Sequence, residues 1–136
     1  MLTDADFDSA VEGSLNAWLF NHGQCCVCGY SSCVEDTIFE KFTEAVAHAA
    51  SQVKIGTGLD PTTQLGPIGY FVEPTVFVDV KPDFSIVQEE IFGPVVAALP
   101  FNADDGQSPP QTFPSTSSRR ASGLATPPRL TTRQSV

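Results

Sequence analysis

The residues best suited to chemistry in this 136-residue sequence are its four cysteines. They lie within nine positions of one another, at Cys25, Cys26, Cys28 and Cys33. A cysteine thiolate is a strong nucleophile, and Gly23 just before the cluster favours an accessible turn. Backbone N–H groups in such a turn can stabilise an oxyanion. One interpretation of the cluster is therefore a nucleophilic cysteine.

Two other chemistries and one purely structural role also fit the cluster. Tetrahedral zinc binds histidine and cysteine ligands at comparable spacing, and the candidates are His22, Cys25, Cys28 and Cys33. Cys25 and Cys28 also form a C-x-x-C pair, which is typical of redox-active thiols. Cysteines also pack beneath turns simply as small apolar residues. Spacing alone leaves these interpretations open.

Two helices are predicted on either side of the cluster. Apolar residues recur at intervals of three and four over residues 7–19, as on one face of a helix. A second stripe over residues 38–53 predicts a helix that begins near residues 36–37 and ends at residues 56–58. Thr37 and Glu40 have the spacing of a capping box for that helix.

Three strands are predicted between and after these helices. Residues 31–35 form a short candidate strand, and residues 74–80 are rich in β-branched side chains. Residues 94–99 are continuously apolar, as in a strand that is buried on both faces. Helices that alternate with strands in this way predict an α/β fold.

The charge balance excludes several classes of partner. The formal net charge is −9, which argues against non-specific nucleic-acid binding and against docking on an anionic membrane. The sequence contains no apolar run of transmembrane length. The acidic residues 1–6 lack the pattern of a signal peptide, so a cytoplasmic location is expected.

Composition divides the chain into two parts. Residues 1–101 carry 3 basic and 14 acidic side chains, whereas residues 102–136 carry 4 basic and 2 acidic ones. The second part also holds 5 prolines and 11 serines and threonines, and its few apolar residues follow no helical or strand period. We therefore predict one folded unit at 1–101 and a disordered Ser/Thr/Pro-rich tail at 102–136.

Several strings in the first part resemble the aldehyde dehydrogenase superfamily. Residues 21–26, Asn-His-Gly-Gln-Cys-Cys, are similar to the catalytic-cysteine motif of that family. Residues 2–10, 58–67, 69–77 and 89–94 resemble, in the same order, other segments of its catalytic domain. Together these strings cover nearly all of the chain before the tail. The resemblance implies a partial aldehyde dehydrogenase catalytic domain.

The resemblance also implies a reaction and the residues that perform it. The family oxidises an aldehyde to a carboxylic acid with NAD or NADP, through a thiohemiacetal and then a thioester on a cysteine. The nucleophile of the motif falls on Cys26, whose own N–H contributes to the oxyanion hole. Glu90 matches a glutamate that contacts the nicotinamide-side ribose, and Phe92 matches an aromatic residue beside the nicotinamide ring.

Three departures from the family pattern accompany this resemblance. Most of the family's cofactor-binding region, with its general-base glutamate and its oxyanion-hole asparagine, corresponds to sequence upstream of Met1. Only Ile68 separates Pro67 from Gly69, where the family has several tens of residues. After Phe101 the tail is unrelated to the family. The chain is thus expected to be a fragment with an internal deletion.

These departures predict that the chain alone is inactive, because a catalytic thiol needs a base and a held hydride acceptor. Two alternatives are a non-catalytic fragment that joins full-length subunits in a homo- or hetero-oligomer, and a small zinc-stapled module that uses the four residues named above. The aldehyde and the choice between NAD and NADP depend on segments that this sequence lacks.

Overall fold

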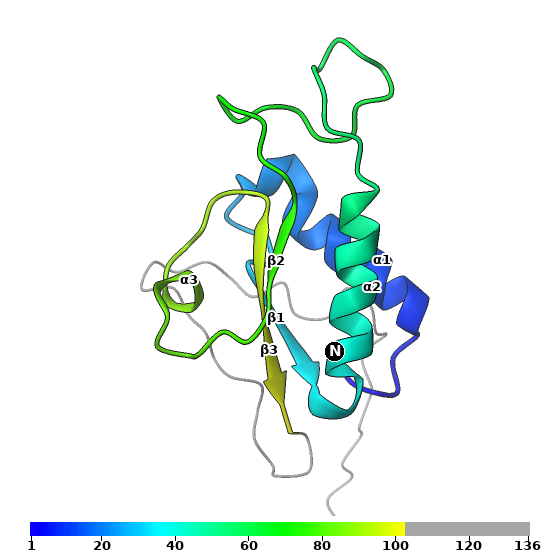
Figure 1. Cartoon of the computed structure of the whole chain (residues 1–136), viewed down its shortest axis with the longest axis vertical. Coiled ribbons are helices and arrows are strands. Elements are labelled where there is room, and N and C mark those ends of the chain that lie inside the picture. Colours follow the sequence, from blue (N-terminus) through cyan, green and yellow to red (C-terminus); the bar gives the residue numbers. More distant parts are fainter. Residues whose placement is uncertain (103–136) are drawn as a thin grey trace, which may run out of the picture.

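The computed structural model describes residues 1–102, and these form an α/β arrangement. One parallel sheet has the strand order β1–β3–β2, where β1 is Ser31–Glu35, β2 is Thr75–Phe77 and β3 is Val95–Phe101. Two helices, α1 (Phe7–Leu19) and α2 (Phe39–Ser51), cover one face of the sheet, and the single turn α3 (Ser85–Gln88) lies on the other (Figure 1). The predicted α/β class is confirmed.

The central strand β3 is buried on both faces, as its continuous apolar sequence predicted. It pairs with β1 from Ala97 onward and with β2 at its beginning. Val96 packs into the core beneath α1 and α2, while Ala97 and Leu99 pack with Val87 of α3. Alternate side chains of one strand thus join the sheet to both helical layers.

Helix α1 spans the residues 7–19 over which the apolar period predicted a helix. The side chain of Asp6 caps its first turn by accepting a hydrogen bond from the N–H of Ser9 at 2.8 Å. Hydrogen bonds from the side chain and from the backbone N–H of Ser9 lower the pKa of Asp6. Ala10 and Trp18 point into the core, and Trp18 is 1% exposed. Burial of this face fixes the helix on the sheet immediately before the cysteine cluster.

Helix α2 departs from the prediction at both ends. A 3₁₀ turn, η2 (Asp36–Ile38), comes first, and Ile38 caps α2 without a side-chain hydrogen bond, so the predicted capping box is wrong. The helix also stops at Ser51, well before the glycines expected to end it. The helix stops early because a tertiary contact takes over, in which Ile55 adopts an extended conformation and pairs with Leu65.

Two elements after α2 also differ from expectation. Strand β2 is shorter than the predicted 74–80, and Asp79 adopts a left-handed φ of 56°, which takes the chain out of extended geometry. The turn α3 was not predicted, because four residues are too few to show a helical period. The core of the fold is therefore α1, α2, β1 and β3.

Among residues 1–102, no helix is long and apolar enough to cross a membrane. Residues 103–136 lie outside the described part of the chain, and with them almost all of the predicted disordered tail.

Candidate active site

The cysteine cluster begins at a strained turn that directly follows α1. The turn is η1 (Phe20–Gly23), and Asn21, His22 and Gly23 have successive φ values of 47°, 61° and 71°. Only glycine adopts this left-handed region freely, so two side chains occupy it at a cost. The turn is closed by Asn21, whose Nδ2 donates to the carbonyl oxygen of Gln24 at 2.9 Å and whose carbonyl accepts the N–H of Gln24 at 3.0 Å.

The turn places the cysteines at very different depths. Cys26 is exposed and Cys25 is half-buried, whereas Cys28 is buried. Cys28 donates its backbone N–H to the carbonyl of Cys25 at 3.0 Å and its Sγ to the carbonyl of Phe20 at 3.3 Å. Within residues 1–102, neither the N–H nor the thiol of Cys26 has a hydrogen-bond partner. Cys26 is thus the accessible thiol, and its N–H is free to bind a ligand oxygen.

Burial also separates the thiols chemically, because desolvation raises the pKa of Cys28. We expect iodoacetamide at pH 8 to alkylate the exposed Cys26 much faster than Cys28, because the buried thiol must be uncovered before it can react. Peptide mapping by mass spectrometry measures both rates in one sample. Equal labelling of Cys26 and Cys28 would show that the turn does not bury Cys28.

Tyr30 stabilises the turn through hydrogen bonds to its backbone carbonyls, a role that the sequence analysis did not predict. Its single O–H is shared between the carbonyl oxygens of Gly23 at 3.0 Å and Cys25 at 2.8 Å, and the side chain is 5% exposed. Burial, helped by the nearby Cys28 and Glu90, raises the pKa of Tyr30 to about 12. The phenol therefore stays protonated and remains a donor at neutral pH.

The loop that carries Glu90 and Phe92 lies directly against the turn. A Cβ placed on Gly23 would lie 1.9 Å from the carbonyl oxygen of Gly93, so the two backbones are in close contact. Phe92 has a left-handed φ of 54° and is 47% exposed, while Glu90 is half-buried. This loop leads into β3 as the cysteine turn leads into β1. Because these strands are parallel neighbours, both loops meet at one end of the sheet.

The structure therefore brings Cys26 to the same end of the sheet as Glu90 and Phe92. The zinc interpretation, in contrast, is wrong. Among residues 1–102, no group of three His, Cys, Asp or Glu side chains is placed to hold a metal ion. His22 instead uses its Nε2 to accept the backbone N–H of Gly66 at 2.9 Å, and the thiol of Cys28 is directed to the carbonyl of Phe20.

The fold and the site together define a class of protein, an α/β domain that presents an exposed thiol on a strained turn. Comparison with protein families matches the aldehyde dehydrogenase family over residues 1–69 and again over 68–107. The chain belongs to the aldehyde dehydrogenase family. The two matched segments meet at residues 68–69, where the sequence predicted an internal deletion.

Curated relatives agree with this assignment. The chain is 34% identical to retinal dehydrogenase 2 of Homo sapiens over 77% of its own length and 27% of that protein. It is 36% identical to a mitochondrial aldehyde dehydrogenase of Mesocricetus auratus over 74% of its length and 27% of that protein. The chain thus spans about a quarter of the length of these relatives.

Solved structures show the same fold. The NAD⁺ complex of an aldehyde dehydrogenase from Bacillus cereus has a TM-score of 0.74 and 34% identity, and the match covers 78% of this chain and 28% of that one. The betaine aldehyde dehydrogenase of Staphylococcus aureus, in a complex with NAD⁺, has a TM-score of 0.73 and 30% identity. The match there covers 76% of this chain and 28% of the other.

Proposed function

We propose that Cys26 is the nucleophile for oxidation of an aldehyde to a carboxylic acid with NAD or NADP. The observation that carries this proposal is the pairing, in one residue, of an exposed thiol and an unpartnered backbone N–H. The turn that holds this residue is braced by Tyr30 and by the Gly93 backbone. We also propose a cytoplasmic location, because the four cysteines are clustered within nine positions and do not form a spread-out disulfide framework.

The chemistry follows from these groups. The thiolate of Cys26 attacks the carbonyl carbon of the aldehyde, so that an S–C bond forms and the carbonyl electron pair moves to oxygen. The N–H of Cys26 is available to stabilise that oxyanion. Loss of a hydride from the same carbon leaves a thioester, and water then releases the carboxylic acid and the thiol.

The described residues fit only one edge of the nicotinamide cofactor. Phe92 presents a half-exposed ring and Glu90 a carboxylate near the cysteine turn, which suits contacts with the nicotinamide ring and its ribose. A bound nicotinamide supplies the hydride acceptor. No Gly-x-Gly-x-x-Gly string, the usual cradle for the pyrophosphate, occurs in the sequence.

We therefore propose that aldehyde oxidation requires elements beyond those described here. Correct orientation of reactants supplies about 7–11 kcal/mol of barrier reduction, and a general base supplies about 10²–10⁴-fold in rate. The purified 136-residue chain, given a small aldehyde and NAD⁺, is expected to form NADH no faster than its Cys26→Ala variant. Steady NADH formation that disappears in Cys26→Ala would contradict this expectation.

The nucleophile itself can be tested without a cofactor. The probe is p-nitrophenyl acetate, an activated ester that transfers its acetyl group to a thiol and releases nitrophenolate. We expect the full chain to acquire its acetyl group first on Cys26, as mapped by mass spectrometry. The fast phase of nitrophenolate release should disappear in Cys26→Ala and persist in Cys25→Ala, the matched control from the adjacent position. Acetylation of Cys25 in preference to Cys26 would overturn the assignment of the nucleophile.

A further inference from the structure

The imidazole of His22 connects the cysteine turn to a segment far away in the sequence. Its Nε2 accepts the N–H of Gly66 at 2.9 Å, across 44 positions of the chain. His22 also has a left-handed φ of 61°, which costs about 1 kcal/mol or more for a residue other than glycine. A non-glycine residue persists in such a conformation when surrounding contacts determine it. The contact with Gly66 is one that the turn cannot provide by itself.

The segment that precedes Gly66 is held in a closed loop by its own backbone hydrogen bonds. The N–H groups of Gln64 and Leu65 both donate to the carbonyl of Lys54, at 2.9 and 3.2 Å, and Gly56 donates to the carbonyl of Leu65 at 3.1 Å. These bonds close a loop over residues 54–65 and hold its two ends side by side. Gly66 follows directly, so its N–H has a fixed direction.

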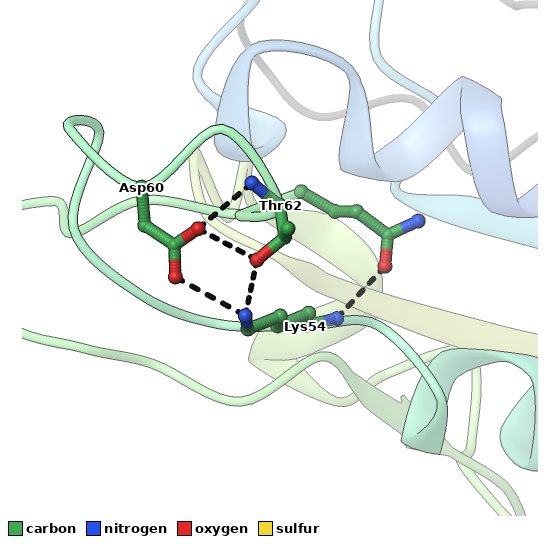
Figure 2. Close-up of polar contacts among 4 residues, drawn as sticks. Lys54, Asp60 and Thr62 are labelled. Atoms are coloured by element: carbon green, nitrogen blue, oxygen red, sulfur yellow. Dashed lines mark hydrogen bonds and ion pairs between the residues drawn. The ribbon is translucent and has the colours of Figure 1, made fainter.

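A cluster of polar side chains reinforces this loop (Figure 2). The Nζ of Lys54 lies 3.1 Å from Oδ2 of Asp60 and also donates to the hydroxyl of Thr62. Asp60 accepts the backbone N–H of Thr62 at 2.9 Å, and the side-chain oxygen of Gln64 accepts the N–H of Lys54 at 2.9 Å. The hydrogen bonds from Thr62 and Lys54 lower the pKa of Asp60, so its carboxylate remains charged at neutral pH.

Packing at the contact leaves little freedom for either partner. A Cβ placed on Gly66 would lie 3.1 Å from Nε2 of His22, so the imidazole sits tightly over the Gly66 backbone. Gly23, the next residue after His22, is at the same time pressed against Gly93. The turn is therefore held between two loops, one through His22 and the other through Gly23. Cys26 lies three residues beyond the second of these contacts.

We propose that His22 is a positioning residue for Cys26, through the hydrogen bond that its Nε2 accepts from the N–H of Gly66. This inference rests on the proposed function, because it assigns His22 a part in orienting the N–H of Cys26 toward the oxyanion. Loss of the imidazole releases the turn from the 54–66 segment. Steps that need the oriented N–H then slow, while simple alkylation of the exposed thiol does not.

The test compares two reactions of Cys26 in the full chain. Acetylation by p-nitrophenyl acetate passes through an oxyanion, whereas alkylation by iodoacetamide does not. We expect His22→Ala to lower the acetylation rate about five- to tenfold, the value of one hydrogen bond, and to leave alkylation within about twofold. His22→Gln, whose side-chain oxygen can accept the same hydrogen bond, should restore most of the rate. His48→Ala, which removes the exposed histidine of α2, is the matched control.

Two further measurements report directly on the hydrogen bond between Gly66 and His22. Nitrogen chemical shifts of His22 should show a proton on Nδ1 and none on Nε2. Hydrogen exchange of the Gly66 amide should accelerate about five- to tenfold in His22→Ala and not in His48→Ala. Equal exchange in both variants, or equal acetylation of wild type and His22→Ala at Cys26, would overturn the inference. Failure of the wild-type chain to be acetylated at Cys26 would instead overturn the proposed function, while Gly66 exchange would still report the contact.

Discussion

Replacing Gly23 by alanine is expected to destabilise the chain by about 2–5 kcal/mol and to separate the cysteine turn from the Gly93 loop. Two costs add at this position. The backbone has a φ of 71°, which disfavours any Cβ, and that Cβ would lie 1.9 Å from the carbonyl oxygen of Gly93. Neither group is the flexible end of a side chain, so relief requires the backbones to move apart.

Urea titration followed by the fluorescence of Trp18, the only tryptophan, measures this loss. Gly58→Ala is the matched control, because a Cβ at Gly58 meets no atom within 4 Å and its φ lies outside the left-handed range. The control should shift the midpoint slightly or not at all. If Gly23→Ala and Gly58→Ala unfold at the same urea concentration, the close contact between the turn and the Gly93 loop does not exist in solution.

Truncation of Phe42 to alanine should cost about 3–5 kcal/mol, the usual range for a large buried aromatic residue. Phe42 is 3% exposed and joins α2 to α1 through an edge-to-face contact with Phe7, with ring centroids 6.1 Å apart. The same core holds Trp18 and Val96, so a cavity at Phe42 weakens the support of the cysteine turn.

The matched control for Phe42 is Phe84, which is 43% exposed. Phe84→Ala removes the same number of atoms from a position that contributes little to the core, and should cost about 1 kcal/mol or less. Both variants are compared by urea titration with far-UV circular dichroism. A loss at Phe84 as large as that at Phe42 would contradict the packing of α2 against α1.

Patterns of neighbouring residues in the sequence predicted the elements that form through local interactions. The apolar period over residues 7–19 and the continuous apolar run over residues 94–99 each correspond to an element in the structure, α1 and β3 respectively. The predicted start of α2 was wrong because a 3₁₀ turn comes first. The predicted end of α2 was wrong because the chain leaves the helix to pair Ile55 with Leu65, a long-range contact. Such pairing leaves no periodic trace in the sequence.

The candidate site shows the same division. The resemblance identified Cys26, Glu90 and Phe92, and the structure places the loops that carry them together. The sequence did not reveal Tyr30 as a donor to the turn, because its partners are backbone carbonyls. The contact of Gly23 with Gly93 joins residues 70 positions apart and was equally invisible. A glycine just before a reactive cysteine was the available signal, and it was interpreted only as a local turn.

We propose that residues 1–102 fold as one unit, in which the hydrophobic core and the cysteine turn form together. The most direct test is a urea titration of the full chain in which Trp18 fluorescence and the alkylation rate of Cys28 are measured in parallel. Cys28 is buried by the turn, and Trp18 by the core. We expect a single cooperative transition with coincident midpoints. Rapid alkylation of Cys28 at urea concentrations where Trp18 remains buried would contradict it.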